Sequence, residues 1–150
     1  MNSSMAILEE TTRCTHLIVR AATNEEGPQV GALVWRAGFI VEGIDWTDIQ
    51  PYWLVAEVNG TIKGAIQMCP GKPMARLELL SIDEGMRMIL KGRLVKMLLL
   101  SACYAMQRVG AQYVCGVIPD RLASYRHVLE KHGAWRLSAG SMYLKRIKFV

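Results

Sequence analysis

The feature that most constrains the fold of this chain is the Asn59-Gly60 pair, which lies between two runs of β-prone residues. The runs are WLVAEV (53–58) and TIKGAIQM (61–68). Asn-Gly is the preferred pair for a type I′ turn, because the twist of that turn matches the twist of two antiparallel strands. The sequence therefore predicts a β-hairpin over residues 53–68, and a further β-prone run at 75–82 predicts a third strand.

Two helices are predicted around this hairpin. Thr23 and Glu26 have the spacing of a capping box, and apolar residues then follow at i, i+3, i+4 and i+7 up to Ala37, so a first helix is expected to end at Gly38. A longer helix is expected from about Lys91 to Val109. It is apolar nearly all round, which predicts that it packs against a sheet.

The remaining elements complete a mixed pattern. Strands are predicted at residues 16–22 and 113–118, a helix at 120–132, and a final hairpin at 134–147. The chain of 150 residues is near the commonest size of a domain. We expect one α+β domain over residues 1–150, with a mixed, mostly antiparallel sheet of about six to seven strands flanked by helices. Residues 1–14 are expected to be a poorly structured N-terminal extension.

Composition excludes several classes of protein. Apolar residues make up 51% of the chain and charged residues 21%, which is typical of a globular domain. The longest uncharged run on the long helix, residues 97–106, is about half of a membrane span, and the N-terminus has no secretory-signal pattern. The four cysteines are scattered, without a Cys-x-x-Cys pair or a zinc-binding pattern with histidine. These observations predict a cytoplasmic protein without a metal site or a membrane partner.

The net charge of +5 favours an anionic partner. A phosphorylated cofactor, a nucleic acid and an acidic protein surface all meet that requirement. Nucleic acid is disfavoured, because no basic groove interleaved with aromatic residues and no helix-turn-helix spacing is apparent.

Three segments together carry a resemblance to a known family. They are AEVNGTIKGAI (56–66), LELLSI (77–82) leading into a basic helix, and VLEKHGAW (128–135) before the last hairpin. In this order and spacing they resemble the GNAT superfamily of N-acetyltransferases over residues 17–145. The resemblance implies the GNAT fold and acetyl-CoA as cofactor.

In that family the pyrophosphate of acetyl-CoA is held by backbone N–H groups before a helix, in an Arg/Gln-x-x-Gly-x-Gly/Ala signature. Counting back from Gly110 places this signature on residues 89–94. Gly92 matches, whereas Ile89 and Leu94 depart from the pattern, and the side chain of Leu94 is expected to crowd the phosphates. The resemblance implies a set of cofactor-binding residues, namely Ile82, Lys91, Gly92, Arg93 and Leu94. The alternative is that Gly92 only begins a helix and that its basic neighbours face water.

The catalytic residues are also implied by the resemblance. The family's tyrosine, which returns a proton to the CoA thiolate, is replaced here by Leu129. Tyr125, one helical turn earlier, is the substitute general acid, and Ser124 is a poorer one. Glu78 is the first candidate for the general base that removes the proton of the amine, and Glu57 is the second. The alternatives are a packing role for Tyr125 and an ordinary solvated carboxylate at Glu78.

Two functions remain open. The first is transfer of an acetyl group to an amine of a small molecule or a protein, with residues 38–52 lining the acceptor cleft and Asp45, Trp46, Asp48 and Tyr52 contacting a cation there. The second is a catalytically degenerate GNAT-fold protein that serves in binding or assembly, as a homodimer or with another partner. Divergent members encoded by bacteriophages show a similar helix of basic and apolar residues, which would make a virion-associated location the alternative to a cytoplasmic one.

Overall fold

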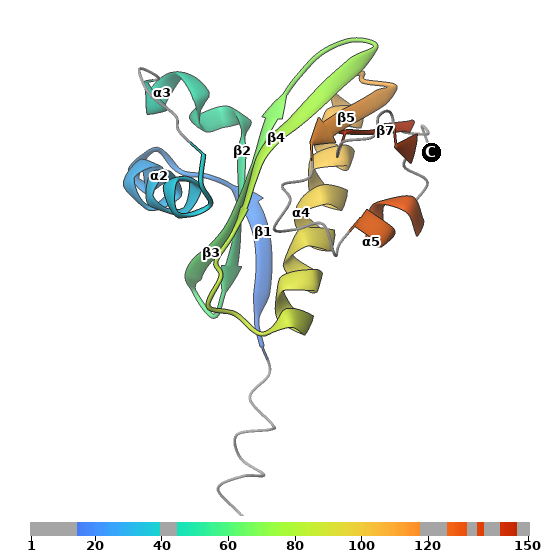
Figure 1. Ribbon diagram of the computed structural model, residues 1–150. Coiled ribbons are helices and arrows are strands. Elements are labelled where there is room, and N and C mark those ends of the chain that lie inside the picture. The colour runs from blue at the N-terminus through green and yellow to red at the C-terminus, as the bar shows by residue number, and fades with distance from the viewer. Residues whose placement is uncertain (1–14, 40–44, 118–125, 132–134, 137–141, 147–150) are drawn as a thin grey trace, which may run out of the picture.

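The computed structural model describes residues 15–39, 45–117, 126–131, 135–136 and 142–146. Their strands form one sheet, with α2 and α3 on one face and α4 on the other (Figure 1). The elements before the long helix are β1 (Leu17–Ala21), η1 (Asn24–Glu26), α2 (Gly27–Arg36), α3 (Trp46–Ile49), η2 (Gln50–Tyr52), β2 (Trp53–Val58), β3 (Thr61–Cys69) and β4 (Met74–Ile82). They are followed by α4 (Met88–Arg108), β5 (Tyr113–Val117), α5 (Arg126–Lys131), β6 (Trp135–Arg136) and β7 (Met142–Arg146).

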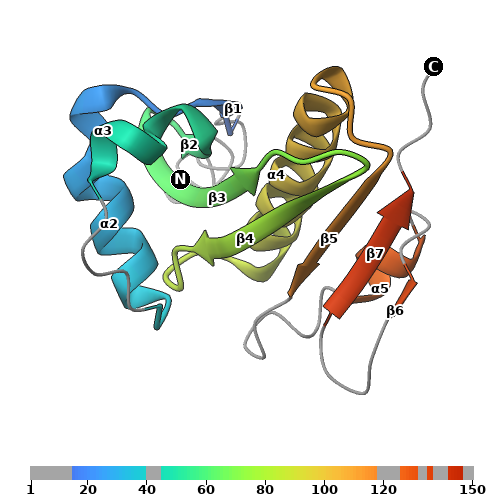
Figure 2. The ribbon, with the colours of Figure 1, turned by 90° about the horizontal axis from the view of Figure 1, so that it is seen from above.

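The sheet has seven strands in the order β1-β2-β3-β4-β5-β7-β6. Strands β4 and β5 pair in parallel, and the other neighbouring pairs are antiparallel. Helix α4 makes the crossover between the two parallel strands (Figure 2). The mixed, mostly antiparallel α+β architecture predicted from the sequence is therefore confirmed, and so is the order of its elements.

The central hairpin forms where the Asn-Gly pair predicts it. Asn59 has φ 50° and Gly60 has φ 84°. Positive φ at both central residues is the requirement of a type I′ turn. Strands β2 and β3 then pair from Val58↔Thr61 to Trp53↔Gln67.

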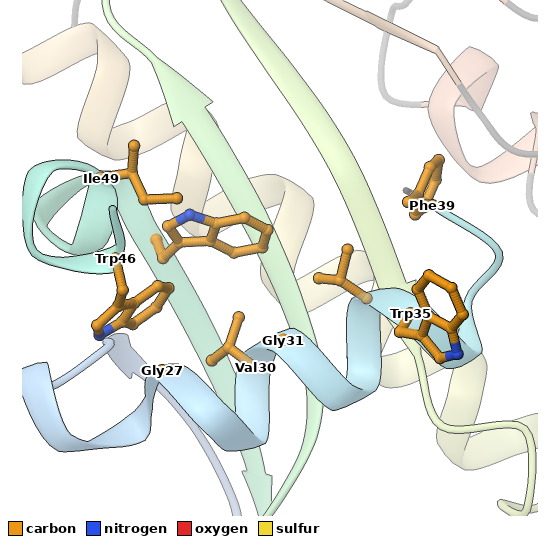
Figure 3. Close-up of a pocket in the computed structure, with 9 residues that line it drawn as sticks. Gly27, Val30, Gly31, Trp35, Phe39, Trp46 and Ile49 are labelled. Carbon is orange, nitrogen blue, oxygen red and sulfur yellow. The ribbon is translucent and has the colours of Figure 1, made fainter. Parts of the chain in front are cut away.

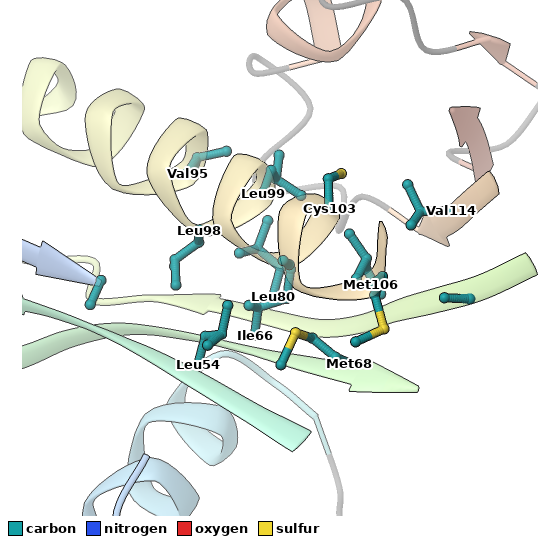
Figure 4. Packing of buried hydrophobic residues seen from close by; sticks show 14 of the residues in the cluster. Leu54, Ile66, Met68, Leu80, Val95, Leu98, Leu99, Cys103, Met106 and Val114 are labelled. Atoms are coloured by element: carbon teal, nitrogen blue, oxygen red, sulfur yellow. The ribbon is translucent and has the colours of Figure 1, made fainter. Parts of the chain in front are cut away.

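The main core lies between α4 and the sheet. Leu54, Ile66 and Leu80 from the strands meet Leu98 and Met106 from the helix (Figure 4). A Cβ atom added at Gly64 would lie only 3.0 Å from Leu98 Cδ1, so α4 packs closely on β3 at this point. Burial of this apolar surface is the main term that fixes the helix to the sheet.

A second, smaller core lies under α2 on the opposite face. Val30, Leu33 and Val34 of the predicted helical stripe pack on Trp53 and on its neighbours in the sheet. The helix ends as predicted, since Gly38 adopts φ 86° beyond it.

An ion-pair cluster holds the start of α2 to β1 and β2. Both Nη atoms of Arg20 donate to the Glu26 carboxylate at 2.7 Å, and Arg20 Nε donates to Glu57 Oε1 at 3.1 Å. The backbone N–H of Thr23 also donates to Glu26, at 2.7 Å, as the capping box predicts. Hydrogen bonds from Arg20 and Thr23 outweigh the effect of burial and lower the pKa of Glu26 from 4.5 to about 2.

This cluster predicts acid sensitivity. Because the pKa of Glu26 is lowered by folding, its contribution to stability is complete above pH 4.5 and is lost as the pH falls toward about 2. We expect Glu26→Gln to lower the free energy of unfolding by about 1–2 kcal/mol at pH 6, a range that allows for screening at the partly exposed Arg20. The difference from wild type should shrink as the pH approaches 2.5, as measured by urea unfolding. Glu25→Gln is the matched control; an equal loss in that exposed neighbour would contradict the role of the cluster.

No helix among the described residues is long and apolar enough to cross a membrane. In the same part of the chain, no group of three or more His, Cys, Asp or Glu side chains is arranged to hold a metal ion.

Candidate functional site

Strand β4 extends beyond the end of the pairing with its neighbour β5. The parallel pairing extends from Met74↔Tyr113 to Leu77↔Gly116, whereas β4 continues to Ile82. Within the described residues, the backbone of β4 beyond Leu77 therefore has no strand paired on this edge. Backbone amides at such an edge can donate hydrogen bonds to a bound molecule.

A β-bulge coincides with this edge. On the other side of β4, Glu78 pairs with Gln67 and Ser81 pairs with Ala65, so β4 has one residue more than β3 across this interval. Leu79 takes up the extra residue with φ 54°, and it packs on the α2 side. Glu78 consequently lies next to a site where the strand bends, which is a common position for functional residues.

The start of α4 follows directly after this strand. Asp83 holds the connecting loop, because its carboxylate accepts from the backbone N–H of Gly85 at 2.9 Å and from Lys63 Nζ at 3.2 Å. These hydrogen bonds lower the pKa of Asp83. The N–H of Lys91 donates to the carbonyl of Arg87 at 3.0 Å, so the amides of Ile89 and Leu90 precede the helical hydrogen-bonding pattern. The positive end of the α4 dipole lies at these amides.

The predicted boundary of this helix is wrong by one turn. Helix α4 begins at Met88 and not at about Lys91. Residues 89–94 therefore lie inside the first two turns of the helix and not in a loop before it. Arg87 at the N-cap makes no side-chain capping hydrogen bond, which explains why the sequence carries no capping signal at this point.

The structure separates the predicted cofactor residues into two groups. Leu94 is 0% exposed, and both Leu94 and Ile82 belong to the core under α4. The expectation that the Leu94 side chain crowds a phosphate is therefore wrong. Arg93 is exposed and Gly92 is half-buried, whereas the Lys91 side chain is only 13% exposed and its Nζ pairs with Glu84 at 3.3 Å.

The candidate bases differ in their partners. Glu57 is engaged by Arg20 in the ion-pair cluster. Glu78 has a side chain that is 41% exposed, and its contact with Arg76 Nε is longer, at 3.4 Å. Glu78 is thus the more available carboxylate. The candidate general acids Tyr125 and Ser124 lie outside the described residues.

Glu78 shares a row of side chains with Trp53. The pairings Trp53↔Gln67 and Gln67↔Glu78 run across three neighbouring strands. Directly opposed residues point to the same face of a sheet, and strands are spaced about 4.8 Å apart. The backbone positions of Trp53 and Glu78 are therefore separated by about 10 Å on the α2 face.

A cleft of about 180 Å³ opens above Trp53, between α2 and α3. Trp46 and Ile49 lie at one end of it and Trp35 and Phe39 at the other, with Val30 and Gly31 of α2 along its side (Figure 3). The side chain of Trp53 is 2% exposed, and its Nε1 has no hydrogen-bond partner within the described part of the chain.

Trp46 fixes the geometry of this cleft. Its Nε1 donates to the carbonyl of Asn24 at 2.9 Å, and its ring lies 6.2 Å from that of Trp53. A Cβ atom at Gly27 would lie 2.8 Å from the Trp46 ring, whereas a Cβ atom at Gly31 would meet nothing within 4 Å. Gly27 thus permits the contact between α2 and α3, and Gly31 leaves space in the cleft.

The predicted acceptor region is only partly the region that lines the cleft. Of the lining residues, Phe39, Trp46 and Ile49 come from residues 38–52. Asp45, Asp48 and Tyr52 do not line it, and Asp45 instead caps α3 by accepting from Thr47 N at 2.9 Å. Sequence reasoning missed the other lining residues. Trp35 is apolar but lies outside the buried stripe of its helix, and Gly31 is a glycine within a helix. Both are unusual for a helix that only packs on a sheet, so both could have been noticed in the sequence.

The chain was compared with protein families, with curated proteins and with solved structures. No family model matches the sequence, and no curated protein matches it. Among solved structures, N-acetylglutamate synthase from Neisseria gonorrhoeae, in complex with coenzyme A and L-arginine, superimposes with a TM-score of 0.69 at 10% identity. That match covers 90% of this chain but only 34% of the synthase, so the chain spans about a third of that protein.

Two smaller proteins match over nearly their whole length. A GNAT-family acetyltransferase from Staphylococcus aureus gives a TM-score of 0.69 at 13% identity, covering 89% of this chain and 100% of that one. An acetyltransferase of putative function from Salmonella typhimurium, solved with its cofactor acetyl-CoA, gives 0.66 at 12% identity, with coverages of 90% and 96%. At these identities the likeness concerns the fold. The chain has the fold of the GNAT acetyltransferases.

Proposed function

We propose that this protein is an acetyl-CoA-dependent N-acetyltransferase whose acceptor is an amine of a small molecule or a protein. The observation that carries the proposal is the coincidence of three features: the free edge of β4, the bulge at Leu79 and the start of α4. The same fold occurs in proteins solved with coenzyme A or acetyl-CoA.

The cofactor would lie along the free edge of β4 with its pyrophosphate at the start of α4. The amides of Ile89 and Leu90 and the positive end of the helix dipole suit an anion there. Lys91 and Arg93 would add charge-assisted hydrogen bonds, and Gly92 allows a close approach to the helix backbone. The side chains of Ile82 and Leu94 are buried in the core under α4, so they would not contact the cofactor.

The chain's own residues then have three tasks in acetyl transfer. Acetyl-CoA, when bound, supplies the acetyl group as a thioester. Backbone N–H groups of β4 beyond Leu77 would donate to the thioester oxygen. Glu78 would take the proton of the attacking amine as the C–N bond forms and the C–S bond breaks. Tyr125 is proposed to return a proton to the CoA sulfur.

Calorimetric titration with acetyl-CoA and CoA tests the phosphate site. We expect wild-type protein to bind, and Ile89→Asp to weaken binding at least about tenfold, because one carboxylate would repel the phosphates over a distance of a few ångströms. An acidic residue in the first turn favours the helix, so the variant should fold. Ile89→Asn is the matched control without the charge, and equal affinities of the two variants would contradict this location. Absence of binding to wild-type protein would refute the proposed function.

A second candidate function is a GNAT-fold binding or assembly protein without catalysis. One observation favours it: Met88 and Ile89, in the first turn of α4, are 65% and 77% exposed. Large apolar side chains at that place suit a protein partner, or a second copy of this chain, better than a phosphate. Protein that fails to bind CoA and elutes as a dimer in size-exclusion chromatography would support this candidate.

A further inference from the structure

We infer that the cleft between α2 and α3 selects acceptors that carry one uncharged aromatic or bulky apolar group, with the reactive amine several bonds away. The inference rests on the proposed acetyltransfer function and names the class of acceptor for it. Three observations support it: the position of the cleft relative to Glu78, the chemistry of its lining, and the space left open at Gly31.

The position follows from the row of side chains on the α2 face. Trp53 lines the cleft, and Gln67 and Glu78 follow it on the next two strands. The two ends of this row are about 10 Å apart. A short alkyl chain that extends from an apolar group at Trp53 past Gln67 has the length to bring an amine toward Glu78.

The lining excludes a charged group. Its described residues are glycine, valine, isoleucine and aromatic residues, and none of them carries a charge: Gly27, Val30, Gly31, Val34, Trp35, Phe39, Trp46, Ile49 and Trp53. A carboxylate placed here would lose its hydration without gaining a partner, and an ammonium group would gain only the faces of the aromatic rings. An apolar cavity of about 150 Å³ holds one benzene molecule in another protein, so 180 Å³ suits a single aromatic ring.

Gly31 keeps this space open. A side chain at this position would point into open space beside the cleft, because an added Cβ atom meets nothing within 4 Å. Glycine within a helix is less favourable than alanine by about 1 kcal/mol, so a larger residue would have been the better choice for helix stability alone. A larger side chain at position 31 would therefore occupy open space beside the cleft.

The test uses two amines of matched length, 4-phenylbutylamine and 1,4-diaminobutane, in which a phenyl group replaces an ammonium group. We expect kcat/KM with acetyl-CoA to be at least about tenfold higher for 4-phenylbutylamine, in line with the discrimination that one apolar pocket supplies. Gly31→Leu should abolish this preference while leaving the affinity for acetyl-CoA unchanged. Ala32→Leu is the matched control, since Ala32 is exposed on the same helix and does not line the cleft.

A second readout separates the two proposals. Binding of 4-phenylbutylamine without cofactor is followed by tryptophan fluorescence, because three tryptophans line the cleft. Binding that is lost in Gly31→Leu and kept in Ala32→Leu supports the cleft assignment, even if no acetyl transfer occurs and the proposed function fails. Acetyl transfer without a preference for the phenyl amine, or binding that Gly31→Leu does not change, would overturn the inference.

Discussion

Replacing Leu94 with alanine is expected to lower the free energy of unfolding by about 3 kcal/mol and to leave the affinity for acetyl-CoA unchanged. Leu94 is 0% exposed in the core between α4 and the sheet. Removal of a buried leucine side chain loses its transfer free energy and leaves a cavity, at a cost of about 2–5 kcal/mol. Urea unfolding measures the first quantity, and calorimetric titration at a temperature where both proteins are folded measures the second.

This variant also separates two interpretations of the helix. If residues 89–94 formed a phosphate loop, alanine at position 94 would restore the small residue of the family signature and tighten acetyl-CoA binding. The structure instead places Leu94 in the second turn of α4, facing the sheet. Ile89→Ala is the control, and because Ile89 is exposed we expect its effect on stability to stay within about 0.5 kcal/mol. Tighter binding by Leu94→Ala, without loss of stability, would contradict a buried packing role for Leu94.

The elements that could be predicted from the sequence are those with local signals. Asn59-Gly60 marks the hairpin, Thr23 and Glu26 mark the start of the first helical segment, and Gly38 and Gly110 mark two helix ends at positive φ. Each signal acts within a few residues, so it can be recognised without knowledge of tertiary contacts. The start of α4 lacks such a signal, because Arg87 at its N-cap contributes no side-chain cap.

The site depends on contacts that no local pattern records. Leu79 adopts positive φ although leucine rarely does so, and neither glycine nor asparagine marks the bulge. Trp53 reads as an ordinary strand residue, yet it lines the cleft together with residues of two helices. Glu78 could be chosen from the sequence because it lies on the strand that the resemblance identifies. Its place in one row with Gln67 and Trp53 follows only from the register of the sheet.

Replacing Glu78 with glutamine is expected to lower kcat/KM for acetyl transfer by about 100-fold, which is the low end of the contribution of a positioned general base. Glutamine keeps the size of the side chain but cannot accept the proton of the ammonium form of the acceptor. The affinity for acetyl-CoA should not change, because Glu78 lies on the α2 face of β4 and not at the start of α4. The deficit should shrink as the assay pH rises toward about 10, since alkylamines lose their proton in that range without help.

Glu57→Gln separates this role from a structural one. Glu57 lies on β2, two strands away from β4, and accepts hydrogen bonds from Arg20. Its loss should therefore reduce stability, while kcat/KM at a temperature well below unfolding stays near the wild-type value. A general base is needed only while the amine carries its extra proton. A variant that lacks the base should therefore regain activity at high pH, where the amine is already neutral, and a variant with a purely structural defect should not. Full activity of Glu78→Gln, or a deficit that is the same at every pH, would show that Glu78 does not remove the proton. The better explanation would then be that the acceptor binds as the neutral amine.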